Sequence, residues 1–186
     1  IALACEDGSL RTFDVTATMT ADDGDAVAPQ YVRGYSKHDG RALCVAWSPD
    51  DTQLISGGDD GSVRVWDVAT AASTLQMAVE DPLGGHSGAG GSGTLVWSVT
   101  MLNDAGRTVV TGDSLGGTAF WDGCFGTLIR RFAAHRADVL SVVASSDGTE
   151  VYASGIDNCV TQFVFVAGDD AGDASDSDSD SGGDGQ

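Results

Sequence analysis

The chain has 186 residues, enough for one domain with a sizeable core. Its 28 acidic and 9 basic side chains give a net charge of −19, which argues against a broad surface for nucleic acid or anionic membranes. No run of about 18 apolar residues predicts a transmembrane helix, and no signal peptide is visible. Residue 1 is not Met and lies in a predicted strand, so we expect a segment of a longer protein.

The first 35 residues predict the remainder of a β-sheet unit. Residues 1–5 and 10–14 read as its inner strands, joined by an acidic Gly-containing turn, and residues 30–35 read as its outer strand. Between them, residues 16–29 form a polar, acidic connection without periodicity.

The best-formed unit spans residues 43–68, LCVAWSPDDTQLISGGDDGSVRVWDV, with an outer strand near residues 73–79. It predicts three short strands joined by two turns, because Pro, Asp and Gly favour turn geometry. In the first strand Leu43, Val45 and Trp47 alternate with smaller residues, as expected for a strand packed on both faces.

A Gly-rich loop over residues 80–93 precedes a third unit, with strands predicted at 95–101, 107–111, 117–121 and 127–132. The last unit, residues 139–165, shows three strands and no evident fourth. We take residues 1–167 as the folded segment. Residues 168–186, an Asp/Ser/Gly tail, have nothing apolar to bury and are predicted to be disordered.

The units repeat. Aligning Trp66-Asp67 with Trp121-Asp122 brings the third unit into register, and the last unit aligns with the second without gaps. That alignment also places His135 on His38, outside the stretch used to find it. The sequence therefore predicts an all-β fold, a WD-repeat β-propeller segment of about four blades, two complete and two partial.

A side-chain network is predicted inside the second unit. In propellers of this type a His before the inner strand, a Ser or Thr, a turn Asp and the Trp often hydrogen-bond in series, and a buried polar chain must be satisfied. The candidate residues over the three later units are His38, Ser56, Asp60, Trp66, Thr111, Trp121, His135 and Asp157. The alternative, a catalytic Ser/His/Asp set, is disfavoured because these residues serve packing in a repeat.

Two glycine-containing motifs resemble the signatures of other kinds of site, an esterase nucleophile and a dinucleotide-binding loop. Residues 112–116 read Gly-Asp-Ser-Leu-Gly, which resembles an esterase signature, but the next predicted element is a strand and not the required helix. Residues 88–93 match G-x-G-x-x-G within the Gly-rich loop, without the βαβ unit that a dinucleotide site needs. We expect no catalytic site, no cofactor and no small-molecule substrate.

His38, His86 and His135 are the only histidines, and the equivalent pair should lie in different blades, so a shared metal site is not expected. The four cysteines, Cys5, Cys44, Cys124 and Cys159, form no C-x-x-C pair and are expected to be reduced thiols in an intracellular protein. Several bases lie on or near loops that lead into successive blades. They are solvated charges or contacts for phosphate or an acidic partner: Arg33, Lys37, Arg41, Arg130 and Arg136.

The amino-acid sequences of particular segments resemble those of the cirhin family, WD-repeat proteins of the UTP-A subcomplex of the small-subunit processome. The segments that carry this resemblance are residues 4–10, 40–43, 97–99, 108–116, 120–122 and 125–128. The resemblance implies a non-catalytic nucleolar scaffold in ribosome biogenesis and pre-18S rRNA processing. Its implied partners are other WD-repeat proteins of a large assembly, the U3 snoRNP and the 5′ external transcribed spacer of pre-rRNA, with no membrane.

Two other functions fit parts of the sequence. A cytoplasmic WD-repeat adaptor, such as a substrate receptor of a ubiquitin ligase, would have the same fold. A GDSL-type esterase is the more remote alternative. In the tail, Ser175 and Ser177 each precede an Asp by three residues, which suits acid-directed kinases such as casein kinase 2 and makes them candidate phosphosites.

Overall fold

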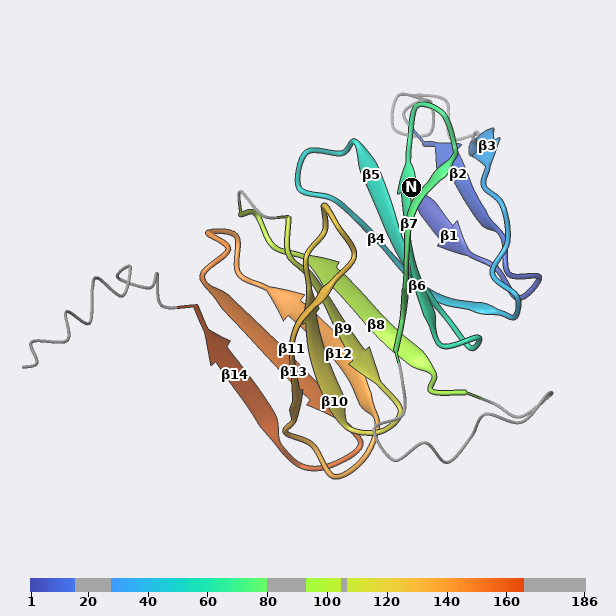
Figure 1. Cartoon of the computed structure of the whole chain (residues 1–186). Helices are drawn as coiled ribbons and strands as arrows, with labels where there is room; N and C mark the ends of the chain where they lie inside the picture. The colour runs from blue at the N-terminus through green and yellow to red at the C-terminus, as the bar shows by residue number, and fades with distance from the viewer. Residues whose placement is uncertain (16–27, 80–92, 105–106, 166–186) are drawn as a thin grey trace, which may run out of the picture.

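The computed structural model describes residues 1–15, 28–79, 93–104 and 107–165. Within these ranges the chain forms fourteen β-strands and no helix, and the strands pair into four antiparallel sheets that follow one another in chain order (Figure 1). The all-β prediction is confirmed. The predicted disordered tail, with Ser175 and Ser177, lies outside the described residues.

Each sheet is a meander of consecutive strands. The first sheet contains β1 (Ala2–Ala4), β2 (Leu10–Asp14) and β3 (Gln30–Gly34). The second contains β4 (Ala42–Trp47), β5 (Gln53–Gly58), β6 (Ser62–Asp67) and β7 (Ser73–Ala78). The third contains β8 (Val96–Met101), β9 (Val109–Asp113), β10 (Gly117–Trp121) and β11 (Leu128–Ala133). The last contains β12 (Val139–Ala144), β13 (Glu150–Gly155) and β14 (Val160–Val164).

The inner strand β4 departs from the simple alternation that its sequence predicts. A β-bulge lies between Ala42 and Cys44, so Leu43 is an extra residue and is not part of the regular register. From Cys44 onward the alternation is regular: Cys44 packs towards the third sheet and Val45 towards the first. The same bulge recurs in β8 and β12, where Trp97 and Leu140 are the extra residues.

Strand β9 begins two residues later than predicted. Arg107 has a φ of 49°, in the left-handed region that interrupts an extended strand, and it therefore belongs to the preceding turn. The last sheet has three strands in the described part of the chain, as predicted.

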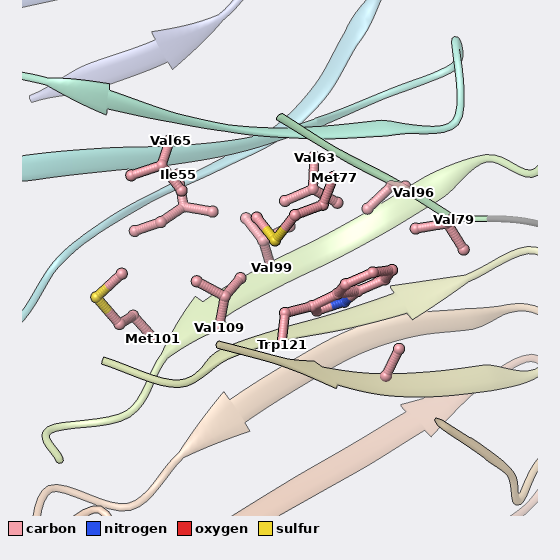
Figure 2. Close-up of a cluster of buried hydrophobic side chains, with 11 residues drawn as sticks. Ile55, Val63, Val65, Met77, Val79, Val96, Val99, Met101, Val109 and Trp121 are labelled. Carbon is pink, nitrogen blue, oxygen red and sulfur yellow. The ribbon is translucent and has the colours of Figure 1, made fainter. Parts of the chain in front are cut away.

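The apolar cores lie between neighbouring sheets, which stack face to face. The largest core joins the second and third sheets, where Ile55 and Val63 meet Val96, Val99 and Trp121 (Figure 2). The first strands of neighbouring sheets also lie against one another: β1 contacts β4, β4 contacts β8, and β8 contacts β12. Sheets that converge on their inner strands and share cores across their faces are blades of a β-propeller.

Turns of one blade support the loop that leads into the next. In the first blade Gly8 has a φ of +82°, and a Cβ there would lie 2.3 Å from the carbonyl oxygen of Gly40. In the third blade Gly116 has a φ of +78°, and its Cβ would lie 2.3 Å from the oxygen of His135. Only glycine combines this backbone conformation with such a close approach. These contacts fix the position of the loops that carry His38 and His135.

Candidate functional site

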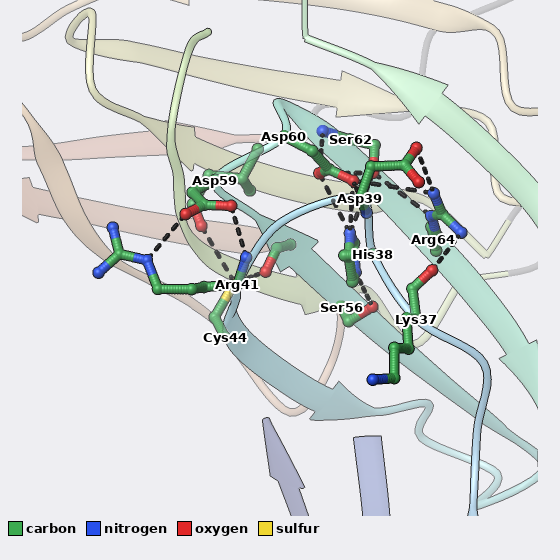
Figure 3. Close-up of polar contacts among 12 residues, drawn as sticks. Lys37, His38, Asp39, Arg41, Cys44, Ser56, Asp59, Asp60, Ser62 and Arg64 are labelled. Carbon is green, nitrogen blue, oxygen red and sulfur yellow. Dashed lines mark hydrogen bonds and ion pairs between the residues drawn. The ribbon is translucent and has the colours of Figure 1, made fainter. Parts of the chain in front are cut away.

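The second blade contains a continuous hydrogen-bonded network. His38, from the loop before β4, places Nδ1 3.1 Å from Asp60 Oδ1 and Nε2 2.7 Å from Ser56 Oγ on β5 (Figure 3). Trp66 on β6 donates its indole N–H to the same Ser56 Oγ at 2.9 Å. The four residues that the sequence selected in this blade are therefore linked, in the order Asp60, His38, Ser56, Trp66.

The turn between β5 and β6 shapes one end of this network. Asp60 Oδ1 accepts the backbone N–H of Ser62 at 2.9 Å, and Oδ2 accepts that of Asp39 at 2.9 Å. Gly58 leaves the space for this contact, because a Cβ there would lie 2.6 Å from both Asp60 Oδ1 and His38 Nδ1. The Asp60 side chain thus ties the loop before β4 to the turn after β5.

The surroundings of Asp60 favour its carboxylate. Burial acts to raise the pKa of Asp60, but hydrogen bonds from His38, Ser62 and the backbone of Asp39 outweigh it and hold the pKa well below the ordinary 3.8. In the last blade, the hydrogen bond from His135 likewise lowers the pKa of Asp157. A carboxyl group with a depressed folded-state pKa stabilises the fold above its unfolded pKa, and this contribution is lost as pH falls through the folded value.

We therefore expect the Asp60 carboxylate to stabilise the chain at neutral pH and to lose this contribution progressively as pH falls from about 4 towards its lowered folded-state pKa. The measurement is the thermal midpoint of the wild type and of Asp60→Asn between pH 7 and pH 3. The wild type should melt at the higher temperature at pH 7, and the gap should narrow as pH falls. A gap that stays constant over this range would show that Asp60 ionisation does not contribute.

The order Asp60, His38, Ser56 imitates a catalytic triad, but its setting does not. Ser56 is fully buried, and its hydroxyl oxygen already faces the indole N–H of Trp66. A nucleophile must reach a substrate carbonyl, and the buried oxygen has no open side for one. The arrangement is suited to fixing strands β5 and β6, the turn between them and the loop before β4 relative to one another.

Removing one donor tests this network. Trp66→Phe keeps most of the buried ring area and removes the indole N–H, so the free energy of unfolding should fall by about 1–3 kcal/mol. Denaturant unfolding of both proteins measures the difference. Trp97→Phe is a useful comparison, because Trp97 donates to Asp138 at 2.8 Å in a half-buried site outside the network. An unchanged stability for Trp66→Phe would mean that its N–H contributes nothing.

The last blade keeps only one half of the network. His135 Nδ1 lies 2.7 Å from Asp157 Oδ1, as in the second blade. Its Nε2 is buried and has no hydrogen-bond partner among the described residues. The reason is in the sequence: Ala153 and Phe163 stand at the positions of Ser56 and Trp66, so neither the hydroxyl nor the indole is present. The network of the last blade is therefore shorter than that of the second blade.

The third blade uses a different polar pair. Trp121 donates to Thr111 Oγ1 at 3.1 Å, which joins the two residues selected from the sequence. The fully buried Asp113 forms an ion pair with Arg131 on β11 at 2.7 Å, and sequence analysis missed it. Gly117 leaves the space for this pair, because a Cβ there would lie 2.3 Å from Asp113 Oδ2 and 2.5 Å from Arg131 Nε.

Sequence analysis also missed the arginines that form ion pairs with the turn aspartates. Arg64 donates to the carbonyl oxygen of Lys37 at 2.8 Å and lies 3.7 Å from Asp60 (Figure 3). In the first blade Arg11 pairs with Asp7 at 2.8 Å. The signal was an Arg three residues after the turn glycine in the first two blades, Arg11 after Gly8 and Arg64 after Gly61. These contacts belong to the loops of the blades and not to an open site.

The five bases named as candidate partner contacts do not gather into one patch. Arg33 donates to the backbone oxygens of Val68 and Ala69 in the second blade. Arg41 pairs with Asp59 at 2.8 Å. Lys37 lies 3.9 Å from Asp7. Arg130 lies over the ring of Phe132, 4.8 Å from its centre, and Arg136 is exposed. Most of these charges therefore have partners inside the chain.

The esterase-like motif at residues 112–116 does not form the site that it resembles. Ser114 lies in the turn between β9 and β10, and its hydroxyl accepts the backbone N–H of Leu95 at 2.9 Å. A strand follows it, as predicted, so no helix N-terminus supports an oxyanion. Residues 88–92 of the dinucleotide-like motif, and His86, lie outside the described residues.

Two other kinds of site, a metal centre and a membrane-spanning helix, are not found in the described ranges. Within them, no three His, Cys, Asp or Glu side chains are grouped so that they could hold a metal ion. No described helix has the length and apolar character to cross a membrane. None of the four cysteines forms a disulfide within the described ranges, and burial raises the pKa of Cys44 to about 12, which disfavours the reactive thiolate.

Comparison with known proteins agrees with the fold. The family model for the WD domain, G-beta repeat, matches residues 29–67 and 126–170. Each match begins near an outer strand, β3 or β11, and covers the next three strands, so it spans parts of two blades.

The chain is also similar to longer proteins that carry the same name in several organisms. It is 32% identical over 170 residues to U3 small nucleolar RNA-associated protein 4 of Schizosaccharomyces pombe, covering 90% of this chain and 22% of the relative. The Saccharomyces cerevisiae protein is 29% identical over 168 residues, covering 88% and 20%. The human homolog is 27% identical over 166 residues, covering 89% and 22%.

The chain thus spans about a fifth of the length of these curated relatives. Three observations support the same fold. They are the four stacked antiparallel sheets, the repeated turn Asp and Trp, and the two matches to the family model. The chain carries WD40 repeats and forms a segment of a WD-repeat β-propeller.

Proposed function

We propose that this chain is a non-catalytic, cirhin-like scaffold of ribosome biogenesis, acting in small-subunit processome assembly and pre-18S rRNA processing. The observation that carries the proposal is its similarity, along about nine tenths of its length, to proteins named for association with U3 small nucleolar RNA. The proposed partners are other WD-repeat proteins, the U3 snoRNP and the 5′ external transcribed spacer. The proposed location is the nucleolus.

The geometry supports a scaffold over an enzyme. The Ser56–His38–Asp60 set is buried and serves to hold strands together, and Ser114 lies in a hydrogen-bonded turn. Stacked blades present loops at both ends of a rigid framework, and such loops bind partners without bond-breaking chemistry. The net charge of −19 favours contacts with basic proteins over long contacts with RNA phosphates.

Depletion of the protein in its own cells tests this function. Precursors of 18S rRNA should accumulate, and expression of the wild-type protein should restore processing. Ser114→Ala should restore it equally well, because a scaffold does not need this hydroxyl. Normal 18S precursors after depletion would contradict the ribosome-biogenesis proposal. Failure of a folded, normally expressed Ser114→Ala protein to restore processing would contradict the non-catalytic one.

A further inference from the structure

A cavity of about 170 Å³ lies between the second and third blades and is partly open to solvent. It is at the end of the sheets where β4 and β8 finish, opposite the loop that carries His38. Pro49 and Asp50 line it from the turn after β4, and residues 101–104 and Arg107 line it from β8 and the turn that follows. The hydrogen-bonded network of the second blade includes none of these residues.

The inner wall of the cavity is apolar and firmly packed. Met101 is 5% exposed and belongs to the core between the second and third blades, at the edge of the cluster in Figure 2. Leu102 is 1% exposed and belongs to the core between the third and last blades. Pro49 adds a rigid ring on the side of the second blade. An aliphatic chain can lie against this wall, as the stems of lysine and arginine do on apolar surfaces.

Two carboxylates lie at the exposed rim of the cavity. Asp104 accepts the backbone N–H of Thr108 at 2.8 Å and the hydroxyl of the same residue at 2.6 Å. Asp50 accepts the hydroxyl groups of Ser48 and Thr52, and these hydrogen bonds lower the pKa of Asp50 to about 2. Each carboxylate is therefore held in a fixed orientation by its own turn, so a charged group that enters the cavity finds its partner already in place.

Arg107 is the cation among the residues that line the cavity, and it is already paired. It donates to Asp50 Oδ2 at 2.9 Å and to Gln53 Oε1 at 3.2 Å. Asp104, by contrast, has no ion pair within the described part of the chain. An apolar wall beside a carboxylate that lacks a cation is suited to a further cationic head group.

The surroundings of the cavity are also acidic. Asp51 follows Asp50 in the turn after β4. The turn of the last blade that holds Asp147 lies beside the cavity, because a Cβ on Gly148 would be 2.9 Å from the carbonyl oxygen of Asn103. Phosphate groups and acidic side chains are repelled by such surroundings, whereas a basic group is attracted.

We propose that this cavity binds a lysine or arginine side chain of a partner protein, with its aliphatic stem against Met101 and Leu102 and its charged head at the Asp104 carboxylate. The stem covers apolar atoms that now face solvent, and the head supplies the cation that Asp104 lacks. The neighbouring carboxylates attract a basic segment towards the cavity. The proposal concerns direct binding by this chain and does not depend on its role in ribosome biogenesis.

Amide NMR of the isotope-labelled chain tests the proposal with a capped peptide, acetyl-Gly-Gly-Lys-Gly-Gly-amide, whose only charge is the lysine. At physiological salt this peptide should shift the amide signals of Leu102, Asp104 and Thr108 in a saturable way. A peptide with glutamate in place of lysine should not shift them. A peptide with diaminobutyrate, which keeps the charge and shortens the stem, should bind more weakly than the lysine peptide.

Two carboxylate variants locate the binding site. Asp104→Asn should weaken binding of the lysine peptide about threefold to fivefold, because it removes the charge but keeps an oxygen for the backbone N–H of Thr108. Asp51→Asn is the matched control. It removes the same charge from a residue outside the cavity lining, where asparagine tolerates the φ of 56°, and should leave the affinity unchanged.

Three results would overturn the proposal. Equal weakening by both variants would show a general attraction to an acidic surface, and no shift at the cavity amides would show that the lysine does not bind there. Shifts of the same amides by inorganic phosphate would show that Arg107 recognises an anion instead.

Discussion

Replacing Ser56 with Ala is expected to lower the free energy of unfolding by about 2–5 kcal/mol. The change removes one hydroxyl but leaves two buried groups without a partner, His38 Nε2 and the indole N–H of Trp66. Each unsatisfied buried polar group costs about 1–3 kcal/mol. The loss should therefore exceed that of Trp66→Phe, which removes a single donor. Denaturant unfolding followed by far-UV circular dichroism measures both.

The last blade supplies the reciprocal variant. Ala153→Ser places a hydroxyl at the position of Ser56, within the blade where His135 Nε2 has no described partner. We expect this variant to be as stable as the wild type or more stable. If Ser56→Ala and Ala153→Ser changed stability by equal amounts in the same direction, the hydroxyl would not be the cause.

Arg131→Leu is expected to cost about 3–5 kcal/mol, because it leaves the Asp113 carboxylate buried without its cation. The side chain of Asp113 is fully buried, and that of Arg131 is 17% exposed. The double variant Asp113→Asn/Arg131→Leu removes the buried charge but keeps an oxygen for the backbone N–H groups of Leu115 and Gly117.

The double variant should therefore be more stable than Arg131→Leu alone, even though it contains one more substitution. Urea unfolding of the wild type, both single variants and the double variant gives the coupling energy directly. Additive losses would show that Asp113 and Arg131 stabilise the blade independently.

The repeat made the fold predictable from the sequence. Turn residues and alternating apolar strands predicted β4 to β6, and alignment of Trp66 with Trp121 then located the strands of the third blade. The sequence-based prediction was wrong at residues where the backbone geometry departs from the regular strand pattern. The bulge at Leu43 and the left-handed φ of Arg107 cannot be inferred from alternation, because alternation assumes regular extended strands.

The networks were predictable only where the repeat pattern is complete. His38, Ser56, Asp60 and Trp66 follow the expected spacing, so their contacts could be inferred. The Asp113–Arg131 pair joins β9 to the outer strand β11 across β10, and no local spacing links two such strands. The contact of Arg107 with Asp50 was also hidden, because it crosses from one blade to another.

Recovery of U3 RNA with the protein is the most direct test of the proposed scaffold function. The tagged protein is purified from its own cells at low salt, and RNA and proteins are identified from the same sample. U3 small nucleolar RNA, the 5′ external transcribed spacer and other WD-repeat proteins should be enriched over a purification with the tag alone. Recovery of ubiquitin-ligase subunits without U3 RNA would contradict this account.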